Sequence, residues 1–371
     1  LTFSKSQRRL LTTCSQDYQS GLSSDLKCLQ AMAFFLIRSQ FLCFNFNQNV
    51  VFVSSSPKSS FSFHSIDDDA SVKKLPYPWK RKICYDNYRI CIFGSCNGFL
   101  LIKFGADFFL WNPSSGFYRK MLAYHRLLVD GQCVTSGLCY DSSTDDYKAV
   151  IWLAEQTLDP DYDDQYVVVG GFKINPPKRV HFPYGNNIGS VHRGPVVNGR
   201  LHWWVSSRNN NYLIIYFDPV KDEFEELPIP EPIYHSDDYN IILGLGVLGG
   251  CLCMARWDNE RDIEVLAMKE SWNTMFIISN LKINPHWATL EPLCFTRGDG
   301  EILMLLMDFW NENKILAYNP GANSHRIIAI PTNYSIDAAT YVESFVSLSP
   351  EAKSRGQRQR KRKEKNFYGL D

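Results

Sequence analysis

The chain has 371 residues, of which 45% are hydrophobic and 14% aromatic, enough for two average domains or one large all-β domain. Its 39 Lys and Arg residues balance 39 Asp and Glu residues, which excludes a global charge that would favour nucleic acid or an anionic membrane. The most apolar stretch, residues 31–53, contains Arg38, Gln40 and the run Asn45 to Asn49, too many polar groups for a spanning helix.

The 11 cysteines form neither CxxC pairs nor a regular disulfide framework. Several lie in apolar runs, where a reduced thiol behaves as a small hydrophobic side chain. With no signal peptide at the start, this cysteine usage predicts a reducing compartment, the cytoplasm or the nucleus. We expect the chain, which begins at Leu1 rather than Met, to be a fragment or an incomplete gene model.

The main signal is an internal repeat of roughly fifty residues. In each copy a glycine-containing turn is followed by an apolar strand and then by a second strand that ends at a Pro or a charged turn. Asn-Gly, Gly-Gly and Asp-Gly favour tight hairpins because such turns need positive φ, which glycine adopts at little cost. Clear copies begin at Gly94, Val197, Leu248 and Gly298, and a divergent copy from Gly137 fits the wide first gap.

Short strands rich in Val, Ile, Leu and aromatic residues at this period predict an all-β fold, a kelch-like β-propeller of about six blades. A large β-sandwich is the alternative, but its strands would be evenly spaced without a long-period repeat. We expect Trp111, Trp203 and Trp272, which lie within the repeats, to be core residues rather than partner contacts.

Three motifs with chemical associations are interpreted as structural. Residues 244–249 fit GxGxxG, but the next residues predict a strand instead of the helix that would bind a pyrophosphate. Residues 94–98 resemble a nucleophile elbow with Cys96 in place of Ser, but again a strand follows. The acidic loop at 159–163 lacks the glycine and glutamate of an EF-hand, and no His or Cys spacing predicts zinc. We therefore predict no metal, no cofactor and no enzymatic activity.

The repeat residues resemble the F-box-associated interaction domain of plant F-box proteins, over residues 67–350. Residues 268–272 are shorter than the family form, and 25–60 follow its pattern less closely. The motifs that carry the resemblance, in the family's order, are GSCNGFL (94–100), LWNPS (110–114), YDxxTDDYK (140–148), NGRLHW (198–203), LGVLGGCLC (245–253), ESW (270–272), PLCF (292–295) and YVESFVS (341–347).

This resemblance implies a domain organisation and a function. Residues 1–24 are expected to be the remnant of the segment that follows an F-box, 25–66 a divergent first blade or irregular segment, 67–350 the F-box-associated propeller, and 351–371 a disordered basic tail. In the family, the propeller captures a target protein while the F-box docks a Skp-type adaptor within a Skp–cullin–F-box ubiquitin ligase. The F-box itself is expected to be missing from this chain.

We therefore expect the substrate-recognition module of such a ligase, with an unknown target protein as partner. The Skp-type adaptor and the cullin would be partners only if an F-box precedes Leu1. The alternative is an F-box-less, stand-alone binding propeller that does not recruit the ligase. No membrane partner is expected.

Partner-binding residues are expected in the connections between strands, because loops on a rigid scaffold carry recognition. Arg and Trp are over-represented among interface hot spots. On these grounds the residues predicted to bind the partner are Arg208, Arg256, Trp257, Trp287 and Trp310.

The basic tail follows the last predicted strand and is too charged to bury, so it is expected to be disordered. Its run lacks aromatic residues, which disfavours contact with nucleic acid. A solvated tail is the alternative to a nuclear-import signal made of Arg358, Arg360, Lys361, Arg362 and Lys363.

Overall fold

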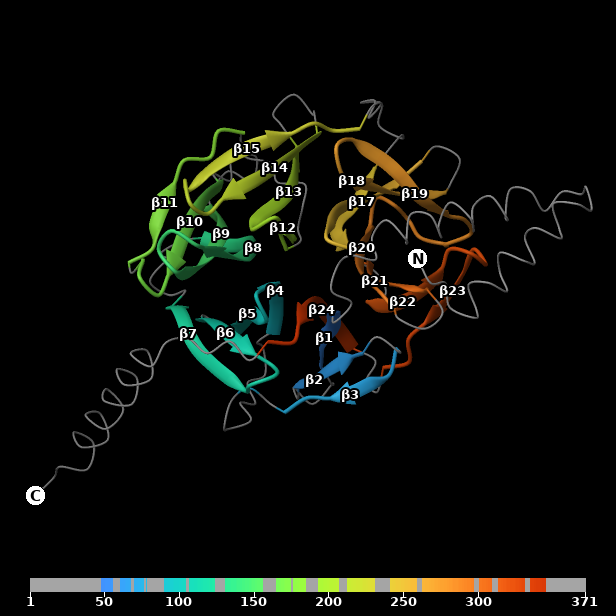
Figure 1. The fold of residues 1–371 in the computed structure, drawn as a ribbon, viewed down its shortest axis with the longest axis horizontal. Coiled ribbons are helices and arrows are strands. Elements are labelled where there is room, and N and C mark those ends of the chain that lie inside the picture. The colour runs from blue at the N-terminus through green and yellow to red at the C-terminus, as the bar shows by residue number, and fades with distance from the viewer. Residues whose placement is uncertain are drawn as a thin grey trace, which may run out of the picture.

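The computed structural model describes residues 48–344, except for 56–60, 68–69, 77, 79–89, 105–106, 124–130, 156–164, 175, 185–192, 207–211, 231–240, 259–261, 297–299, 309–312 and 331–333. The described residues form six four-stranded antiparallel sheets arranged as blades around a central channel (Figure 1). The predicted all-β propeller is confirmed, with six blades. No helix in these ranges is long and apolar enough to cross a membrane.

Five blades follow the chain in order, each with its first strand nearest the axis (Figure 1). Blade 2 contains β4 (Ile90–Cys96), β5 (Phe99–Phe104), β6 (Asp107–Asn112) and β7 (Phe117–Ala123). Blade 3 contains β8 (Gly131–Asp141), β9 (Asp146–Glu155), β10 (Gln165–Gly171) and β11 (Lys178–Val180). Blade 4 contains β12 (Val196–Val197), β13 (Arg200–Ser206), β14 (Tyr212–Asp218) and β15 (Glu223–Leu227). Blade 5 contains β16 (Ile242–Leu248), β17 (Cys251–Trp257), β18 (Ile263–Met268) and β19 (Trp272–Ile278). Blade 6 contains β20 (Ala288–Phe295), β21 (Ile302–Asp308), β22 (Lys314–Asn319) and β23 (Ser324–Ile327).

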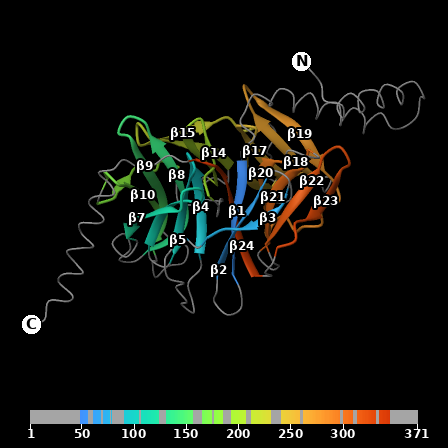
Figure 2. The same cartoon turned by 60° about the horizontal axis from the view of Figure 1, so that its bottom comes forward.

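Blade 1 is built from both ends of the described chain. Its inner strand is β24 (Tyr334–Val342), which pairs with β1 (Gln48–Ser55), followed by β2 (Phe61–Ile66) and β3 (Val72–Lys74). The β1–β24 ladder runs from Gln48 opposite Val342 to Ser55 opposite Tyr334. The ring is therefore closed by a complete antiparallel strand pair. Figure 2 shows neighbouring strands such as β1 and β4 running through the thickness of the ring.

Both faces of every blade are buried against a neighbour. Along β1, Val50 and Phe52 pack against blade 6, whereas Val51 and Val53 pack against blade 2. Because successive side chains of a strand point to opposite faces, two buried faces require a nearly continuous apolar run. This is why the repeats contain runs such as Phe99-Leu100-Leu101-Ile102 rather than alternating polar residues.

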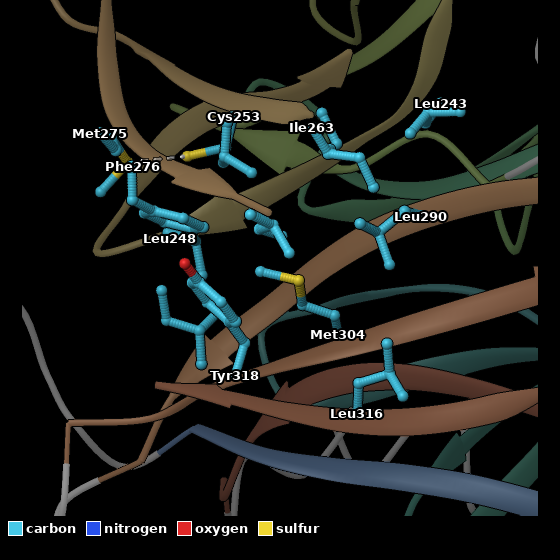
Figure 3. Close-up of a cluster of buried hydrophobic side chains, with 14 of the residues drawn as sticks. Leu243, Leu248, Cys253, Ile263, Met275, Phe276, Leu290, Met304, Leu316 and Tyr318 are labelled. Carbon is cyan, nitrogen blue, oxygen red and sulfur yellow. Dashed lines mark hydrogen bonds between the residues drawn. The ribbon is translucent and has the colours of Figure 1, made fainter. Parts of the chain in front are cut away.

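Six apolar clusters, one between each pair of neighbouring blades, make up the core. Figure 3 shows the cluster in which Leu243 and Cys253 of blade 5 lie near Leu290 and Met304 of blade 6. Full burial of one such side chain contributes about 1.5–3 kcal/mol. The prediction that Trp111 and Trp203 are core residues is confirmed, since they are 1% and 0% exposed.

Trp272 differs from these two core tryptophans. It is half-buried and packs against the cluster between blades 4 and 5. Its indole Nε1 donates a hydrogen bond of 2.7 Å to the carbonyl of Pro228. This side chain therefore links two blades at their rim instead of filling the interior.

A single turn design recurs at one end of the blades. An Asn or Asp accepts hydrogen bonds from main-chain amides two or three residues later, and the fourth residue after it has positive φ. Asn, Asp and Gly tolerate that conformation best. The capping residues are Asn112, Asp141, Asp218 and Asn319, and the positive-φ residues are Gly116, Asp145, Asp222 and Asn323. This hydrogen bonding explains why an Asn or Asp begins these turns of the repeat.

The GxGxxG sequence is explained by close packing of two inner strands. Gly244 and Gly246 lie on β16, which runs beside β20 in the channel wall. A Cβ atom at Gly246 would lie 2.0 Å from the carbonyl oxygen of Pro292, and one at Gly244 would lie 2.6 Å from that of Leu290. The strand β17 follows the motif directly. The structural interpretation of this motif is therefore confirmed.

We predict that Gly246→Ala lowers the free energy of unfolding by about 2–3 kcal/mol, because the added methyl group overlaps main-chain atoms that cannot move aside. Equilibrium unfolding in urea measures this change. Gly321→Ala is the matched control, since its added Cβ would meet only the Asn319 side chain, at 3.4 Å. The control is expected to change stability by less than about 0.5 kcal/mol. Equal effects of the two substitutions would contradict the packing argument.

Candidate functional site

The two ends of the propeller differ in their connections. One end, which we call the turn end, carries the turns between the first and second strands of blades 2 to 6 and between the third and fourth strands of all six blades. The opposite end, the loop end, carries the connections between the second and third strands and between blades. Most connections at the loop end span longer distances in sequence, for example from Glu155 to Gln165 and from Leu227 to Ile242.

A buried ion cluster ties blade 3 to blade 4 at the turn end. The Nζ atom of Lys148, whose side chain is 3% exposed, lies 2.8 Å from Asp141 Oδ2 and 2.8 Å from Asp222 Oδ1. It also donates to the carbonyl of Pro219 at 2.6 Å. Burial opposes the charge on Lys148, but the two carboxylates outweigh burial and leave its pKa above the usual value.

The same segment supplies a second anchor within blade 3. The carboxylate of Asp146 accepts a hydrogen bond of 2.7 Å from the main-chain amide of Lys173. The YDxxTDDYK motif thus combines the cap Asp141, the turn residue Asp145, the anchor Asp146 and the inter-blade Lys148. These residues build the ring, so the turn end is held in one shape by its own contacts.

The described residues among the predicted partner contacts all lie at the loop end. Arg256 and Trp257 are the last two residues of β17, and Trp287 directly precedes β20. Arg208 and Trp310 lie outside the described residues, in the connections that follow β13 and β21. The tail residues 358–363 also lie outside them.

The three described residues differ in how available they are to a partner. The Arg256 guanidinium is held within its blade by Glu264, with Nε and Nη2 at 2.7 and 2.6 Å from Oε2. Trp257 is half-buried against the core cluster between blades 5 and 6. Trp287 is 49% exposed, the only aromatic side chain among the exposed large hydrophobic residues in the described part of the chain. Trp287 therefore offers the largest accessible aromatic surface of the three.

A buried arginine crosses the central channel. Arg193, in the segment before β12, donates from Nη1 to the carbonyls of Ile92 on β4 and Ala338 on β24. Its Nη2 forms an ion pair with Asp337 on β24, and its Nε lies 3.3 Å from Glu291 Oε2 on β20. One side chain of blade 4 thus contacts blades 1, 2 and 6.

The charges of this central cluster are shielded from solvent. The side chains of Arg193 and Glu291 are 6% and 9% exposed. Burial opposes the charge on Arg193, but Asp337 and Glu291 outweigh it and leave the pKa of Arg193 above its usual value. Burial raises the pKa of Glu291 to about 7, although Arg193 acts in the opposite direction. No sequence motif pointed to either residue.

A cavity of about 230 Å³ lies in the channel on the turn-end side of this cluster. Its wall is made by inner-strand segments of blades 1, 2, 4, 5 and 6. Arg193 and Glu291 are the charged lining residues, and both come early in their segments, so they form the floor. Asn97 and Gly98 of the β4–β5 turn lie at the mouth.

Comparison with known proteins agrees with this architecture. A family model described as "F-box associated beta propeller domain" matches residues 40–347. The chain belongs to the F-box-associated β-propeller family. The resemblance predicted from the repeat motifs is thereby confirmed.

Curated relatives of this family member are plant F-box proteins. The chain is 28% identical over 282 residues to the F-box/kelch-repeat protein At3g23880 of Arabidopsis thaliana, covering 71% of this chain and 70% of that protein. It is 26% identical over 313 residues to the F-box protein CPR1 of Arabidopsis thaliana, covering 76% and 73%. Among solved structures, TolB from Acinetobacter baumannii aligns with a TM-score of 0.48 at 8% identity, over 82% of this chain and 70% of that one.

In this F-box-associated propeller, burial also shifts the pKa values of a cysteine and a histidine. Burial raises the pKa of the cavity residue Cys96 to about 12, so its thiol stays protonated and is a poor nucleophile. The residue lies at the end of β4 and is followed by the strand β5, which agrees with the structural interpretation of the elbow-like motif. Burial lowers the pKa of His202 to about 4, so this imidazole is neutral near pH 7. No group of three His, Cys, Asp or Glu residues in the described ranges could hold a metal ion.

The raised pKa of Glu291 makes stability depend on pH. The folded protein keeps the proton on Glu291 up to about pH 7, whereas the unfolded chain releases it near the ordinary value of about 4.3. The contribution of this group to stability is therefore present at low pH and is lost as pH rises through about 7. We predict that, relative to Glu291→Gln, the wild-type free energy of unfolding decreases from about pH 5 to about pH 8.

Urea unfolding of both proteins at several pH values measures this difference, and the pH dependence of all other groups cancels in it. Glu223→Gln serves as the control, because that carboxylate is exposed on β15. Its difference from wild type is expected to stay constant over the same range. A constant difference for Glu291→Gln as well would show that the carboxyl does not retain its proton in the folded protein.

Proposed function

We propose that this chain is the substrate-recognition module of a Skp–cullin–F-box E3 ubiquitin ligase and binds a target protein for ubiquitination. The observation that carries the proposal is the family match over residues 40–347, which spans the whole six-bladed ring. Its relatives At3g23880 and CPR1 are F-box proteins by name. Binding of a protein needs no chemistry from the chain itself, in keeping with the protonated thiol and the ion-paired carboxylates of the channel. The ligase role assigns the protein to the cytoplasm, the nucleus or both.

The loop end is the surface we assign to target binding. Most of its connections are long, and such connections can vary in sequence without disturbing the blades, which is the usual property of recognition loops. The turn end is made of short turns that satisfy their own hydrogen bonds, with Lys148 buried between blades. Loop variation at one end of a constant ring would let related propellers bind different targets.

Trp287 is the residue of the loop end that best fits an anchor. A half-exposed tryptophan can bury a large apolar area against a partner at a low cost in side-chain entropy. Arg256 contributes differently, because its guanidinium is already paired with Glu264 and would have to leave that partner to bind another. We therefore assign Trp287 the larger share of the binding energy.

The ligase role is tested by co-purification from cells of two forms, this chain and the same chain extended upstream in its genomic frame, followed by mass spectrometry. We expect both forms to bring down the same target protein and the extended form alone to bring down a Skp-type adaptor and a cullin. If neither form recruits the ligase, the alternative of a stand-alone binding propeller holds instead.

The loop-end assignment is tested by Trp287→Ala in the same experiment. We predict that this substitution weakens binding of the captured target at least tenfold, corresponding to about 1.4 kcal/mol or more, a typical hot-spot loss. Val220→Ala is the control, because Val220 is a large apolar residue with 52% exposure in a turn of the opposite end. Binding that resists Trp287→Ala but is lost in Val220→Ala would place the target at the turn end.

A further inference from the structure

The cavity at the turn end of the channel has a charged floor and walls that are partly polar and partly apolar. Arg193 and Glu291 form its floor, and Val196, Val247 and Leu293 are the aliphatic residues nearest to them along the lining. Its volume of about 230 Å³ is below the range of about 300–1,000 Å³ typical of pockets for whole small-molecule ligands. The space suits a single side chain with an apolar stem and a polar end.

When Glu291 is ionised, the charges at the floor are not balanced. Arg193 carries one positive charge and has two acidic neighbours, Asp337 and Glu291. Asp337 is well satisfied, since it pairs with Arg193 Nη2 and its Oδ2 accepts a hydrogen bond of 2.7 Å from the amide of Ile92. The Nη1 group of the guanidinium also donates hydrogen bonds to two main-chain carbonyls. Arg193 therefore has few N–H groups left to donate to a ligand.

Glu291 is the incompletely paired member of the cluster. Among the described residues its carboxylate has Arg193 Nε as its one close partner, at 3.3 Å, and Oε2 is buried without a well-aligned hydrogen bond. A carboxylate can accept about four hydrogen bonds. A buried acceptor without a donor costs about 1–3 kcal/mol or more. A donor with positive charge, arriving through the cavity, would satisfy Glu291 and balance the second carboxylate.

We propose that this cavity binds the cationic end of one lysine or arginine side chain of a protein partner. The methylene stem of such a side chain packs along the apolar part of the walls, and its ammonium or guanidinium group reaches Glu291 at the floor. Long basic side chains commonly combine an apolar stem with a charged end in this way. An anionic group is disfavoured here, because it would meet two carboxylates and a guanidinium with few donors left.

This site is separate from the loop end, where we assign target binding. It lies on the axis and its mouth is at the turn end, beside Asn97 and Gly98. Its occupation requires no ligase subunit, so its failure and the failure of the ligase role are distinguishable. The isolated chain is sufficient for the test.

The test uses four blocked tripeptides, Ac-Gly-Xaa-Gly-NH₂ with Lys, Arg, Gln or Glu in the centre, added to methyl-labelled protein. NMR signals of the methyl groups of Val196, Val247, Leu293 and Ala339, which are residues of the cavity lining, report binding. We expect saturable shifts of these signals with the Lys or Arg peptide, and at least tenfold weaker binding of the Gln and Glu peptides. Free n-butylammonium is included to separate a protein side chain from a small amine.

The Glu291→Gln protein is expected to bind the basic peptide at least tenfold more weakly, while Glu223→Gln binds as the wild type does. Unchanged methyl signals elsewhere confirm that the variant is folded. In the wild type, affinity should rise about tenfold from about pH 6 to about pH 8, as Glu291 ionises in the presence of Arg193 and Asp337, the charged groups that act on it.

The proposal is overturned if no peptide shifts the cavity signals, if the Gln or Glu peptide binds as tightly as the basic ones, or if Glu291→Gln has no effect on affinity. Binding of n-butylammonium at least as tight as that of the lysine peptide would overturn the assignment to a protein side chain. Comparison of peptides on the unmodified protein keeps the test valid even if the variant does not fold.

Discussion

Closure of the ring is the constraint on which the rest of this structure depends. Each apolar cluster lies between two blades, so no blade has a core of its own. If β24 separated from β1, Ala338 and Ala339 would leave the clusters on both sides of blade 1, and Arg193 would lose its contacts with Asp337 and Ala338. The β1–β24 strand pair and Arg193 on the axis therefore act together, because both hold β24 in place.

If targets bind at the loop end, as we propose, the two ends of the propeller divide stability from recognition. At the turn end, residues such as Asp141 and Asp222 serve a turn and an inter-blade contact at once, since both carboxylates also bind Lys148. A change there disturbs two blades. The longer connections at the loop end lie beyond the paired strands, so a change in their length or sequence costs the ring little stability. This division explains why the recognisable motifs are concentrated in the strands and turns that build the ring. The residues that choose a target would lie instead in the connections of the loop end, which no motif describes.

The sequence was sufficient to predict the fold because its signals are local. Glycine turns, Asn-Pro and Asp-Pro turns and apolar runs repeat with each blade, and they predicted six blades and the burial of Trp111 and Trp203. The central cluster could not be predicted in this way. Arg193 lies outside any repeat, and Glu291 precedes an apolar run that reads as an ordinary strand. Their partners are about 100 to 145 positions away in the chain, and only the closed ring brings them together.

The central cluster joins ring closure to the proposed cation site. Buried ion pairs seldom stabilise a fold by much, because desolvation offsets their attraction. Here Arg193 is shared between two acids, and the carboxyl that remains incompletely paired is the one at the floor of a cavity. An apolar residue in place of Glu291 would remove this cost, but it would leave the buried Nε of Arg193 without its acidic neighbour. A ligand cation that pairs with Glu291 would weaken the attraction between Glu291 and Arg193. Because Arg193 also pairs with Asp337 on β24, the ligand would act through Arg193 on the strand that closes the ring.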